Sequence, residues 1–436
     1  MNLFESSLKL KGFPIAKAKR DLKAIRQIPE NEFKNYVETK REAIVKYHLK
    51  NTAFYRKLVG TSQPKWEDLP IMTKSILQQP LENRLSNKFN KNSIYVNKTS
   101  GSSGTPFIFG KDKYCHALSW AKFIECYGLY GIDLNASLQA RFYGIPLDSK
   151  AFFKERFKDF LGRRYRFPIF DLSDEKLEEI LNHFQRKKFD YINGYTSVIV
   201  LFAKFLQRKN LILKKECPTL KCCIVTSEML FEDDKKLLEK VLNIPVINEY
   251  GASECGLIAF TDKQHNFLVN SDDLFVEILD EKANPVPNGK AGRIVITSLY
   301  NKAHPIIRYD IGDVGVLNKN STYKQPILEK LLGRTNDFAK LPSGKVVPAL
   351  TFYYITKTVI TNNGNVKEFI IEQIKLNTFK IKYVASDELS AKDKEGVKRA
   401  IAEYLEKNLI VDFERLSQLE RSPSGKLKQF IPLKLN

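Results

Sequence analysis

The feature that most constrains the fold is a strand–helix–strand pattern in the middle of the chain. Two short apolar segments, residues 219–228 (TLKCCIVTSE) and 244–254 (IPVINEYGASE), each end in small polar residues. An amphipathic segment with helical spacing, residues 231–242 (FEDDKKLLEKVL), separates them. This order is typical of a parallel α/β sheet, in which ligands bind at the carboxyl ends of the strands. We therefore expect a binding site there, with Cys222 and Cys223 as core thiols and not metal ligands.

The flanking segments predict a large protein of several parts. Residues 15–60 place apolar residues at helical spacing, and residues 191–210 (YINGYTSVIVLFAKFLQRKN) predict a loop followed by a helix. After Ser271 the pattern becomes β-rich. Near the end, residues 378–384 (TFKIKYV) alternate as a half-buried strand does, and Ser390 can cap the helix that follows. These last elements predict a separate small α+β domain.

Composition narrows the class of protein. The 436 residues carry a net charge of +21 and include 43% hydrophobic residues, which indicates a folded protein with a large core. No apolar run approaches the ~18 residues of a transmembrane helix, and the start of the chain lacks the apolar region of a secretory signal. We therefore expect a cytoplasmic protein with no integral membrane association. The six cysteines suggest no disulfide framework in a chain of this length.

The basic excess is mostly lysine and is spread along the whole chain. The sequence shows no concentrated basic arm and no Arg-rich or aromatic-interleaved motif of the kind that binds RNA. We therefore interpret the charge as a solvated basic surface that suits anionic substrates, and we expect no nucleic-acid partner. A steep salt dependence of DNA binding, without ATP-dependent activity, would favour the nucleic-acid alternative.

A segment rich in glycine and hydroxyl groups, residues 98–107 (KTSGSSGTPF), is a candidate phosphate-binding loop. It does not match the P-loop motif G-x-x-x-x-G-K-[ST], because five residues separate Gly104 from Gly110 and Lys111 is followed by Asp112. Taken alone, such a segment is more often an ordinary turn than a nucleotide site.

Further motifs follow this loop along the chain. They are EYGASE (249–254), RYDIGD (308–313), LLGRTNDF (331–338) and SPSGKLKQF (422–430). Singly, they are typical of a strand end, a hairpin, a linker and a tail. In this order, and after the upstream segment LPIMTK (69–74), they resemble the adenylate-forming ligase superfamily of acyl-CoA synthetases, peptide-synthetase adenylation domains and luciferases. The resemblance is strongest to the phenylacetate-CoA-ligase-like branch, which includes relatives from capsule-polysaccharide biosynthesis.

The resemblance implies a fold and a reaction. The fold is α/β: a large adenylation domain, residues 1–333, has parallel-sheet α/β layers plus a β-rich part. A small mobile α+β domain, residues 334–436, hinges at Asp337. The reaction uses ATP and Mg²⁺ to activate a carboxylic acid as acyl-AMP, releases pyrophosphate and passes the acyl group to an acceptor. Whether the acceptor is the thiol of CoA or an amine stays open, as does the choice between a monomer and a homodimer.

Matched motif by motif, the resemblance also implies roles for individual residues. The phosphates of ATP would lie against Thr99, Ser100, Ser102, Ser103, Gly104 and Thr105. Adenine and AMP would lie against Ser227, Glu228, Tyr250, Gly251, Ala252 and Ser253. Glu254 would hold Mg²⁺, a hard cation that takes a carboxylate plus phosphate oxygens. Asp313 and Arg334 would bind the ribose, and Lys426 would be the catalytic lysine that the small domain inserts.

The sequence leaves the carboxylic acid undetermined. Tyr143, Tyr195 and Thr196 are candidates for an acyl pocket of apolar to mixed character. Some members of this branch carry zinc, but Cys255 lies too early for that site and residues 318–334 contain no cysteine. Because four zinc ligands cannot be assembled from this pattern, we expect no zinc.

A non-catalytic nucleotide-binding protein that kept the fold is the alternative from another class. The joint presence of Glu254, Asp313, Arg334 and Lys426 argues against such a loss of activity.

Overall fold

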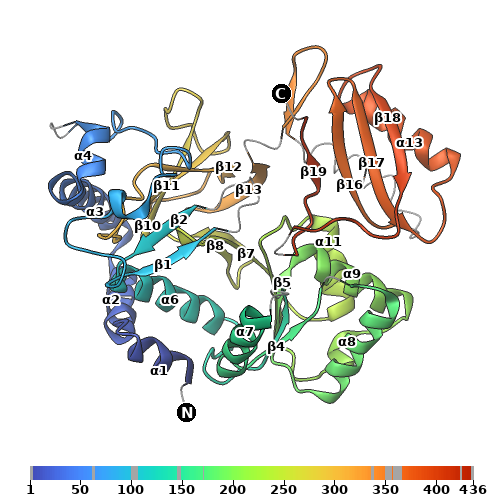
Figure 1. Ribbon diagram of the computed structural model, residues 1–436, viewed down its shortest axis with the longest axis horizontal. Coiled ribbons are helices and arrows are strands. Elements are labelled where there is room, and N and C mark those ends of the chain that lie inside the picture. Colours follow the sequence, from blue (N-terminus) through green and yellow to red (C-terminus); the bar gives the residue numbers. More distant parts are fainter. Residues whose placement is uncertain are drawn as a thin grey trace.

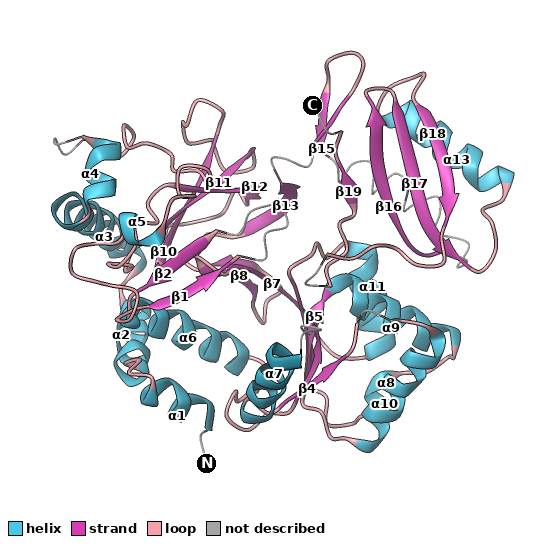
Figure 2. Cartoon of the chain, viewed as in Figure 1, coloured by secondary structure: helices cyan, strands magenta, loops and turns pink. Residues whose placement is uncertain are grey.

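The computed structural model describes residues 3–60, 64–99, 107–144, 149–169, 171–334, 338–348, 356, 366–422 and 425–433. Its largest element is a seven-stranded sheet in the order β4-β3-β5-β6-β7-β8-β9, and two four-stranded sheets complete the main architecture (Figure 1). Helices cover these sheets (Figure 2), so the predicted α/β fold class is confirmed. No helix among the described residues is both long and apolar enough to cross a membrane.

The seven-stranded sheet is parallel from β4 to β7 and antiparallel at β8 and β9. Its strands are β3 (Gln139–Phe142), β4 (Arg164–Phe167), β5 (Tyr191–Tyr195), β6 (Cys222–Thr226), β7 (Val246–Ala252), β8 (Gly256–Thr261) and β9 (Phe267–Val269). Helix α11 (Glu232–Leu242) connects β6 to β7, which confirms the predicted strand–helix–strand unit. Cys222 and Cys223 are fully buried in β6, as predicted for core thiols.

Both faces of this sheet are covered. Helices α8 (Asp174–Arg186), α9 (Thr196–Arg208) and α11 pack on one face, and α6 (Lys113–Gly128) packs on the other (Figure 1). The short helix α10 (Leu213–Glu216) lies with α8 and α11, while α7 (Ser149–Leu161) lies at the β4 edge. Strands that are buried on both faces carry apolar side chains on both, which explains the near-continuous apolar run of β6.

One sequence prediction in this region is wrong. Residues 191–195 were expected to form a loop, but they are the buried strand β5, paired in parallel with β3 and β6. An Asn-Gly pair is typical of a turn, yet here Asn193 accepts a hydrogen bond from the Gln139 side chain of β3, at 3.1 Å from its Nε2. A Cβ on Gly194 would lie 2.5 Å from Phe142, so glycine is needed for close strand packing and not for a turn.

The β-rich part predicted after Ser271 is an antiparallel sheet. It consists of β10 (Leu274–Leu279), β11 (Ala291–Ser298), β12 (Tyr309–Leu317) and β13 (Leu328–Arg334). The helices predicted in residues 15–60 are α2 (Ile15–Gln27), α3 (Glu30–Asn51) and α4 (Ala53–Val59). Helices α3 and α4 share an apolar core with this sheet, whereas α2 and α1 (Leu3–Leu10) pack on α6. Helix α5 (Leu81–Arg84) completes this N-terminal layer.

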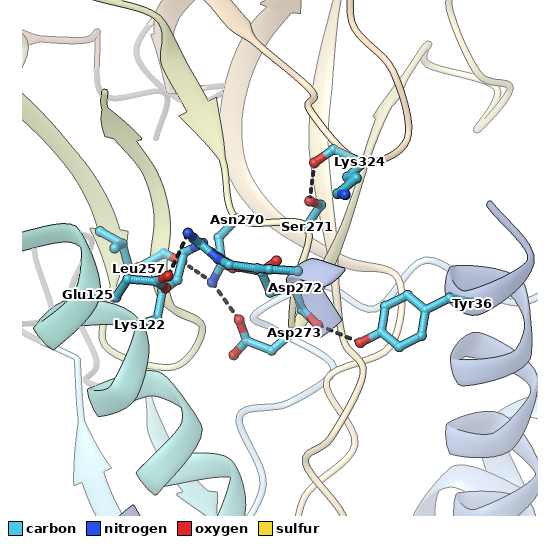
Figure 3. Close-up of polar contacts among 10 residues, drawn as sticks. Tyr36, Lys122, Glu125, Leu257, Asn270, Ser271, Asp272, Asp273 and Lys324 are labelled. Atoms are coloured by element: carbon cyan, nitrogen blue, oxygen red, sulfur yellow. Dashed lines mark hydrogen bonds and ion pairs between the residues drawn. The ribbon is translucent and has the colours of Figure 1, made fainter. Parts of the chain in front are cut away.

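A buried polar network joins α6 and α3 to the segment before β10 (Figure 3). Lys122 of α6 pairs with Asp272 at 2.5 Å between Nζ and Oδ2. The Tyr36 hydroxyl of α3 donates to the backbone carbonyl of Asp272 at 2.7 Å. Asp273 accepts a hydrogen bond from the Asn270 amide at 2.5 Å. Burial raises the pKa of Asp273 to about 6 although Lys122 favours its ionised form.

The C-terminal sheet has the order β18-β17-β16-β19. Its strands are β16 (Val366–Lys375), β17 (Thr378–Ala385), β18 (Ile410–Arg415) and β19 (Phe430–Ile431), and α13 (Ala391–Tyr404) covers it. The hairpin of β14 (Phe338–Lys340) and β15 (Val346–Pro348) adds to the same core. Ser390 caps α13 as predicted, since its Oγ accepts a hydrogen bond from the backbone N–H of Asp393 at 3.1 Å. The small α+β unit thus has a core of its own.

Candidate active site

Three motif residues meet where β7 and β13 end, beside the middle of β12. The hydroxyl of Tyr250 donates to Oδ2 of Asp313 at 2.6 Å, and Nε of Arg334 lies 3.5 Å from Oδ1 of the same carboxylate. Asp313 and Arg334 are register partners across β12 and β13, so the sheet itself sets their approach. Burial raises the pKa of Asp313, while Arg334 and then Tyr250 oppose that shift by favouring the carboxylate. Tyr250, predicted for adenine, therefore lies with the two residues predicted for the ribose.

The backbone directly after Tyr250 is irregular. The register of β7 against β8 shifts between Tyr250 and Gly251, as in a β-bulge, a feature that often re-aims side chains at functional sites. A Cβ on Gly251 would lie only 3.0 Å from the carbonyl oxygen of Gly256, so glycine keeps these two strands close. Ala252 ends β7, and Ser253 is exposed in the turn that follows.

Glu254 turns inward from that turn and is buried. The hydroxyl of Tyr309 donates to its Oε1 at 3.1 Å, which fixes the carboxylate beneath the end of β7. Sequence reasoning did not single out Tyr309, although it stands in the RYDIGD motif four residues before Asp313. The described residues contain no group of three or more His, Cys, Asp or Glu side chains that could hold a metal ion by themselves.

The glycine- and hydroxyl-rich loop connects β1 (Tyr95–Lys98) to β2 (Ile108–Lys111). Thr99 closes its base, since its backbone N–H donates to the Phe107 carbonyl at 2.9 Å and its Oγ1 accepts from the Phe107 N–H at 3.0 Å. Phe107 packs against Tyr309, with 6.2 Å between ring centroids, so the base of the loop lies beside Glu254's partner. The other predicted loop residues lie outside the described residues: Ser100, Ser102, Ser103, Gly104 and Thr105.

Glu228 occupies a different place from the other predicted adenine neighbours. It follows Ser227, which has a left-handed φ of 69° after the end of β6. Its Oε2 accepts from the backbone N–H of Ser197 at the start of α9, at 2.7 Å. Its Oε1 accepts from the backbone N–H of Leu427, at 3.0 Å. One carboxylate therefore connects the parallel sheet to the C-terminal unit.

Lys426 lies on the segment that runs from β18 to β19. The backbone N–H of Ser422 donates to the Lys426 carbonyl at 3.0 Å, and the Ser422 hydroxyl accepts from the Lys426 N–H at 3.1 Å. The Lys426 ammonium lies 5.8 Å from the centroid of the Tyr195 ring at the end of β5. Burial lowers the pKa of Lys426, and the nearby carboxylates of Glu228 and Asp313 counteract that shift. The lysine therefore lies near Asp313 and Arg334, which were predicted to bind the ribose.

The residues proposed for the acyl group lie beside this lysine. The rings of Tyr143 and Tyr195 are 4.7 Å apart between centroids, and Thr196 follows at the start of α9. The Thr196 hydroxyl donates to the backbone carbonyl of Glu228 at 3.3 Å. These contacts bring all three residues to the carboxyl ends of β3, β5 and β6, where the parallel sheet was predicted to bind ligands.

Arg421 makes two contacts that were not predicted, an ion pair within the C-terminal unit and a hydrogen bond across the two units. Arg421 pairs with Glu368 at 2.6 Å, and both side chains are largely buried. The same guanidinium donates to the Ser197 hydroxyl at 3.4 Å. Arg421 directly precedes the SPSGK motif, and this position is the feature of the sequence that could have pointed to it. The predicted hinge residue Asp337 lies outside the described residues.

Comparison with known proteins places this geometry in context. No family model matches the chain. Protein CapK of Staphylococcus aureus is 24% identical over 314 residues, which span 70% of this chain and 66% of that protein, just under two thirds of its length. Amide bond synthetase McbA from Marinactinospora thermotolerans has a similar structure, with a TM-score of 0.54, 13% identity and coverage of 80% of this chain and 70% of that one.

The structural match is closer to 2-hydroxyisobutyryl-CoA ligase. In its postadenylation state with an acyl-AMP, the TM-score is 0.71 at 17% identity, covering 93% of this chain and 90% of that chain. In the thioesterification state, with CoA, the TM-score is 0.55 at 16% identity, covering 93% and 91%. The arrangement of the two units therefore resembles the postadenylation state more closely. This chain has the fold of the adenylate-forming ligases, as its sequence motifs predicted.

Proposed function

We propose that this chain activates a carboxylic acid as its AMP ester and then transfers the acyl group to an acceptor. The observation that carries the proposal is that Lys426, Asp313 and Glu228, from three distant segments, lie close enough for their charges to interact. Lys426 is a cation on a unit that we propose to be movable, and it faces the buried carboxylate of Asp313 and the ends of the parallel strands. Such a cation suits a reaction between two anions, the substrate carboxylate and ATP. The fold shared with adenylate-forming ligases supports this reading.

In the first step, an oxygen of the substrate carboxylate bonds to the α-phosphorus of ATP. The bond between that phosphorus and the bridging oxygen breaks, and pyrophosphate leaves with the electron pair. The Lys426 ammonium would lie between the two anionic reactants and stabilise the charge that develops on the phosphate oxygens. Preorganised contacts of this kind contribute roughly 10²–10³ in rate.

The nucleotide would be held by residues of the larger unit. Tyr250 offers an aromatic face for adenine, and its hydrogen bond to Asp313 fixes the ring. The two oxygens of Asp313 can accept hydrogen bonds from both ribose hydroxyls, with Arg334 beside them. The loop that begins at Thr99 would donate hydroxyl and backbone N–H groups to the β- and γ-phosphates. Its glycines would allow it to close over ATP and release pyrophosphate.

Glu254 fits a magnesium site in which most ligands come from the nucleotide. It is one buried carboxylate, anchored by Tyr309, beside the base of the phosphate-binding loop. Mg²⁺ takes one or two protein carboxylates plus substrate phosphates and water, so no larger cluster is required. When bound, the ion would neutralise charge on the phosphates. The proposal includes no zinc, and metal analysis of protein purified without added zinc should find well under one equivalent.

In the second step, the acceptor bonds to the acyl carbon and displaces AMP, while its proton passes to solvent. We propose that the small domain, residues 334–436, turns about Asp337 away from residues 1–333, so that Lys426 withdraws and the acceptor enters. A CoA thiol is our first candidate acceptor, supported by the similarity to 2-hydroxyisobutyryl-CoA ligase in complex with CoA. An amine is the alternative, supported by the similarity to an amide bond synthetase and by the motif resemblance to capsule-polysaccharide relatives.

The experiment that tests the proposal is acid-dependent exchange of radioactive pyrophosphate into ATP. A panel of aryl, fatty, amino and uronic acids is offered without any acceptor, and we expect exchange with at least one of them. Active acids are then supplied with CoA or with amines, since a thioester product requires free CoA whereas an amide ligase turns over without it. Binding of ATP with no exchange for any acid class would favour the non-catalytic alternative.

A further inference from the structure

Helix α7 presents an unusual outer face. Phe153, Phe157 and Phe160 are 71%, 64% and 76% exposed, and they are the most exposed aromatic side chains among the described residues. Their spacing of four and then three residues places them on one side of a helix. A row of three phenylalanines in water is unfavourable for an isolated folded protein, so this face calls for a partner.

The inner side of α7 is held against the sheet by ion pairs. Arg166 of β4 bonds Asp159 at 2.7 Å and 3.0 Å and reaches Glu155 at 3.2 Å. Asp159 is only 2% exposed. Both acidic residues of the helix are therefore engaged by one buried arginine, and this anchoring turns the phenylalanine row outward. The helix lies next to β4, the edge strand of the seven-stranded sheet (Figure 1).

The charge that borders the phenylalanine row is positive. Residues 149–163 contain five basic residues and two acidic ones, the two that Arg166 engages. Arg156 is exposed between Phe153 and Phe157, and its guanidinium carbon lies 5.3 Å from the Phe152 ring centroid. Lys158 is 53% exposed although it also reaches Glu155. Arg163 is exposed in the turn that follows.

We propose that α7 is a peripheral docking surface for a membrane rich in anionic phospholipids. Helices that lie in the membrane interface combine a row of Phe, Trp or Leu with Lys and Arg on the polar flank. The aromatic rings enter the boundary between headgroups and acyl chains, while the basic side chains extend to the phosphates. Anionic lipids attract such basic segments over about a Debye length. This site lies outside the proposed catalytic residues and stands whether or not the proposed reaction is right.

A second copy of the chain fits this face less well. In a two-fold dimer the same patch meets itself, so Arg156 of both copies would be brought together. Charged residues are depleted from the cores of protein interfaces because burying them there is unfavourable. The interleaving of cations with the phenylalanines therefore favours a negatively charged lipid surface over a symmetric protein partner.

The test is co-sedimentation of the full chain with vesicles. Equal mixtures of phosphatidylglycerol and phosphatidylcholine are compared with phosphatidylcholine alone, at low and at raised salt. We expect binding to the anionic vesicles, weaker binding at raised salt, and little binding to the neutral ones. The triple variant Phe153→Ser, Phe157→Ser, Phe160→Ser should lose roughly tenfold or more in vesicle affinity. A matched control replaces two exposed apolar residues of the β16–β17 turn, Ile374→Ser and Leu376→Ser, and should bind as the parent does.

The outcomes separate the alternatives. Circular dichroism and thermal unfolding of the triple variant should match the parent, since all three side chains are exposed. Absence of parent binding to anionic vesicles at low salt would overturn the proposal. So would equal loss of binding in the control variant. A parent dimer that the triple variant converts to monomers, measured by light scattering without lipid, would assign the face to a second copy of the chain.

Discussion

The carboxylate of Glu228 accepts a hydrogen bond from the backbone N–H of Leu427 at 3.0 Å, although the two residues are 199 positions apart in the chain. The other oxygen of Glu228 accepts from Ser197 at the start of α9. Leu427 directly follows Lys426, so this side chain helps to hold the lysine segment against the parallel sheet. Sequence reasoning assigned Glu228 to the adenine site, and the geometry gives it a second role in holding the two units together.

The first prediction is that Glu228→Gln slows adenylation more than acyl transfer. A glutamine has one carbonyl oxygen and cannot accept from both Ser197 and Leu427. Losing a hydrogen bond to a charged group costs about 1.5–3 kcal/mol, so pyrophosphate exchange should fall roughly ten- to a hundredfold. Conversion of pre-made acyl-AMP should change little. Glu232→Gln, the same change on an exposed residue nearby, is the control and should behave as the parent. Equal loss in both half-reactions would contradict a role confined to holding the units together.

The second prediction concerns the hydrogen bond between Tyr250 and Asp313. Tyr250→Phe keeps the ring but removes a donor that lowers the pKa of the buried Asp313 carboxylate. The folded-state pKa of Asp313 is already raised by burial, so losing the donor should raise it further. The fall in kcat/KM for ATP on the acid side of the pH–rate profile should therefore move to higher pH. Asp313→Asn should remove that fall and lower kcat/KM roughly ten- to a hundredfold. An unchanged profile in Tyr250→Phe would show that Asp313 does not titrate in the reaction.

The third prediction is that Glu254→Gln raises the magnesium concentration needed for exchange. The variant keeps an oxygen for the Tyr309 hydroxyl but loses the charge that a hard cation prefers. We expect a rate loss of roughly tenfold or more at ordinary magnesium, partly restored by excess ion. The parent should lose activity when a chelator removes magnesium. Tyr309→Phe serves as a milder control. Identical magnesium titrations for parent and Glu254→Gln would remove Glu254 from the metal site.

The fourth prediction is asymmetric between the two half-reactions. Lys426→Ala should nearly abolish acyl-AMP formation, because alanine removes the cation that we propose to stabilise the charge on the phosphate oxygens. The same variant should still convert pre-made acyl-AMP to product once the acceptor is supplied, since we propose that the lysine is withdrawn at that stage. Lys428→Ala alters an exposed neighbour and should change little. Full adenylation activity in Lys426→Ala would reject the assigned role.

The fifth prediction uses the buried Asp273 as a pH-dependent element of stability. Its folded-state pKa, about 6, exceeds the unfolded value of 3.8, so the folded protein binds its proton more tightly. Its carboxylate therefore lowers stability at pH above about 6, and that penalty is relieved as pH falls toward 4. A shift of this size corresponds to up to about 3 kcal/mol. The difference in Tm between parent and Asp273→Asn, measured from pH 7 to pH 4, should change in favour of the parent at lower pH. A constant difference would show that Asp273 does not titrate in that range.

The elements that sequence reasoning predicted well are those specified by local pattern. The unit of β6, α11 and β7 was found because apolar runs and helical periodicity lie within one short stretch. Strand β5 was missed because Asn193 and Gly194 resemble a turn, and their burial depends on Phe142 and Gln139 far upstream.

The candidate site shows the same distinction between residues that local sequence identifies and contacts between distant segments. Tyr250, Glu254, Asp313 and Lys426 stand in short motifs that are recognised by their order along the chain, and the structure brings them together. The contacts of Glu228 with Leu427 and of Arg421 with Ser197 join segments that no local pattern relates. Such pairings depend on how the two units dock, which becomes visible in three dimensions.

Lys426 is attached firmly to the small sheet, and this has a consequence for speed. Leu419 and Leu427, on either side of it, pack against Ile370 of β16, and the backbone of Gln429 hydrogen-bonds that of Ile371. In the movement that we propose, the backbone of Lys426 leaves the site together with the sheet to which it is fixed. A whole domain moves against viscous drag from the solvent, whereas the breaking of a phosphate bond involves no such drag. Raising the viscosity of the solvent with glycerol should consequently slow complete turnover more than it slows pyrophosphate exchange.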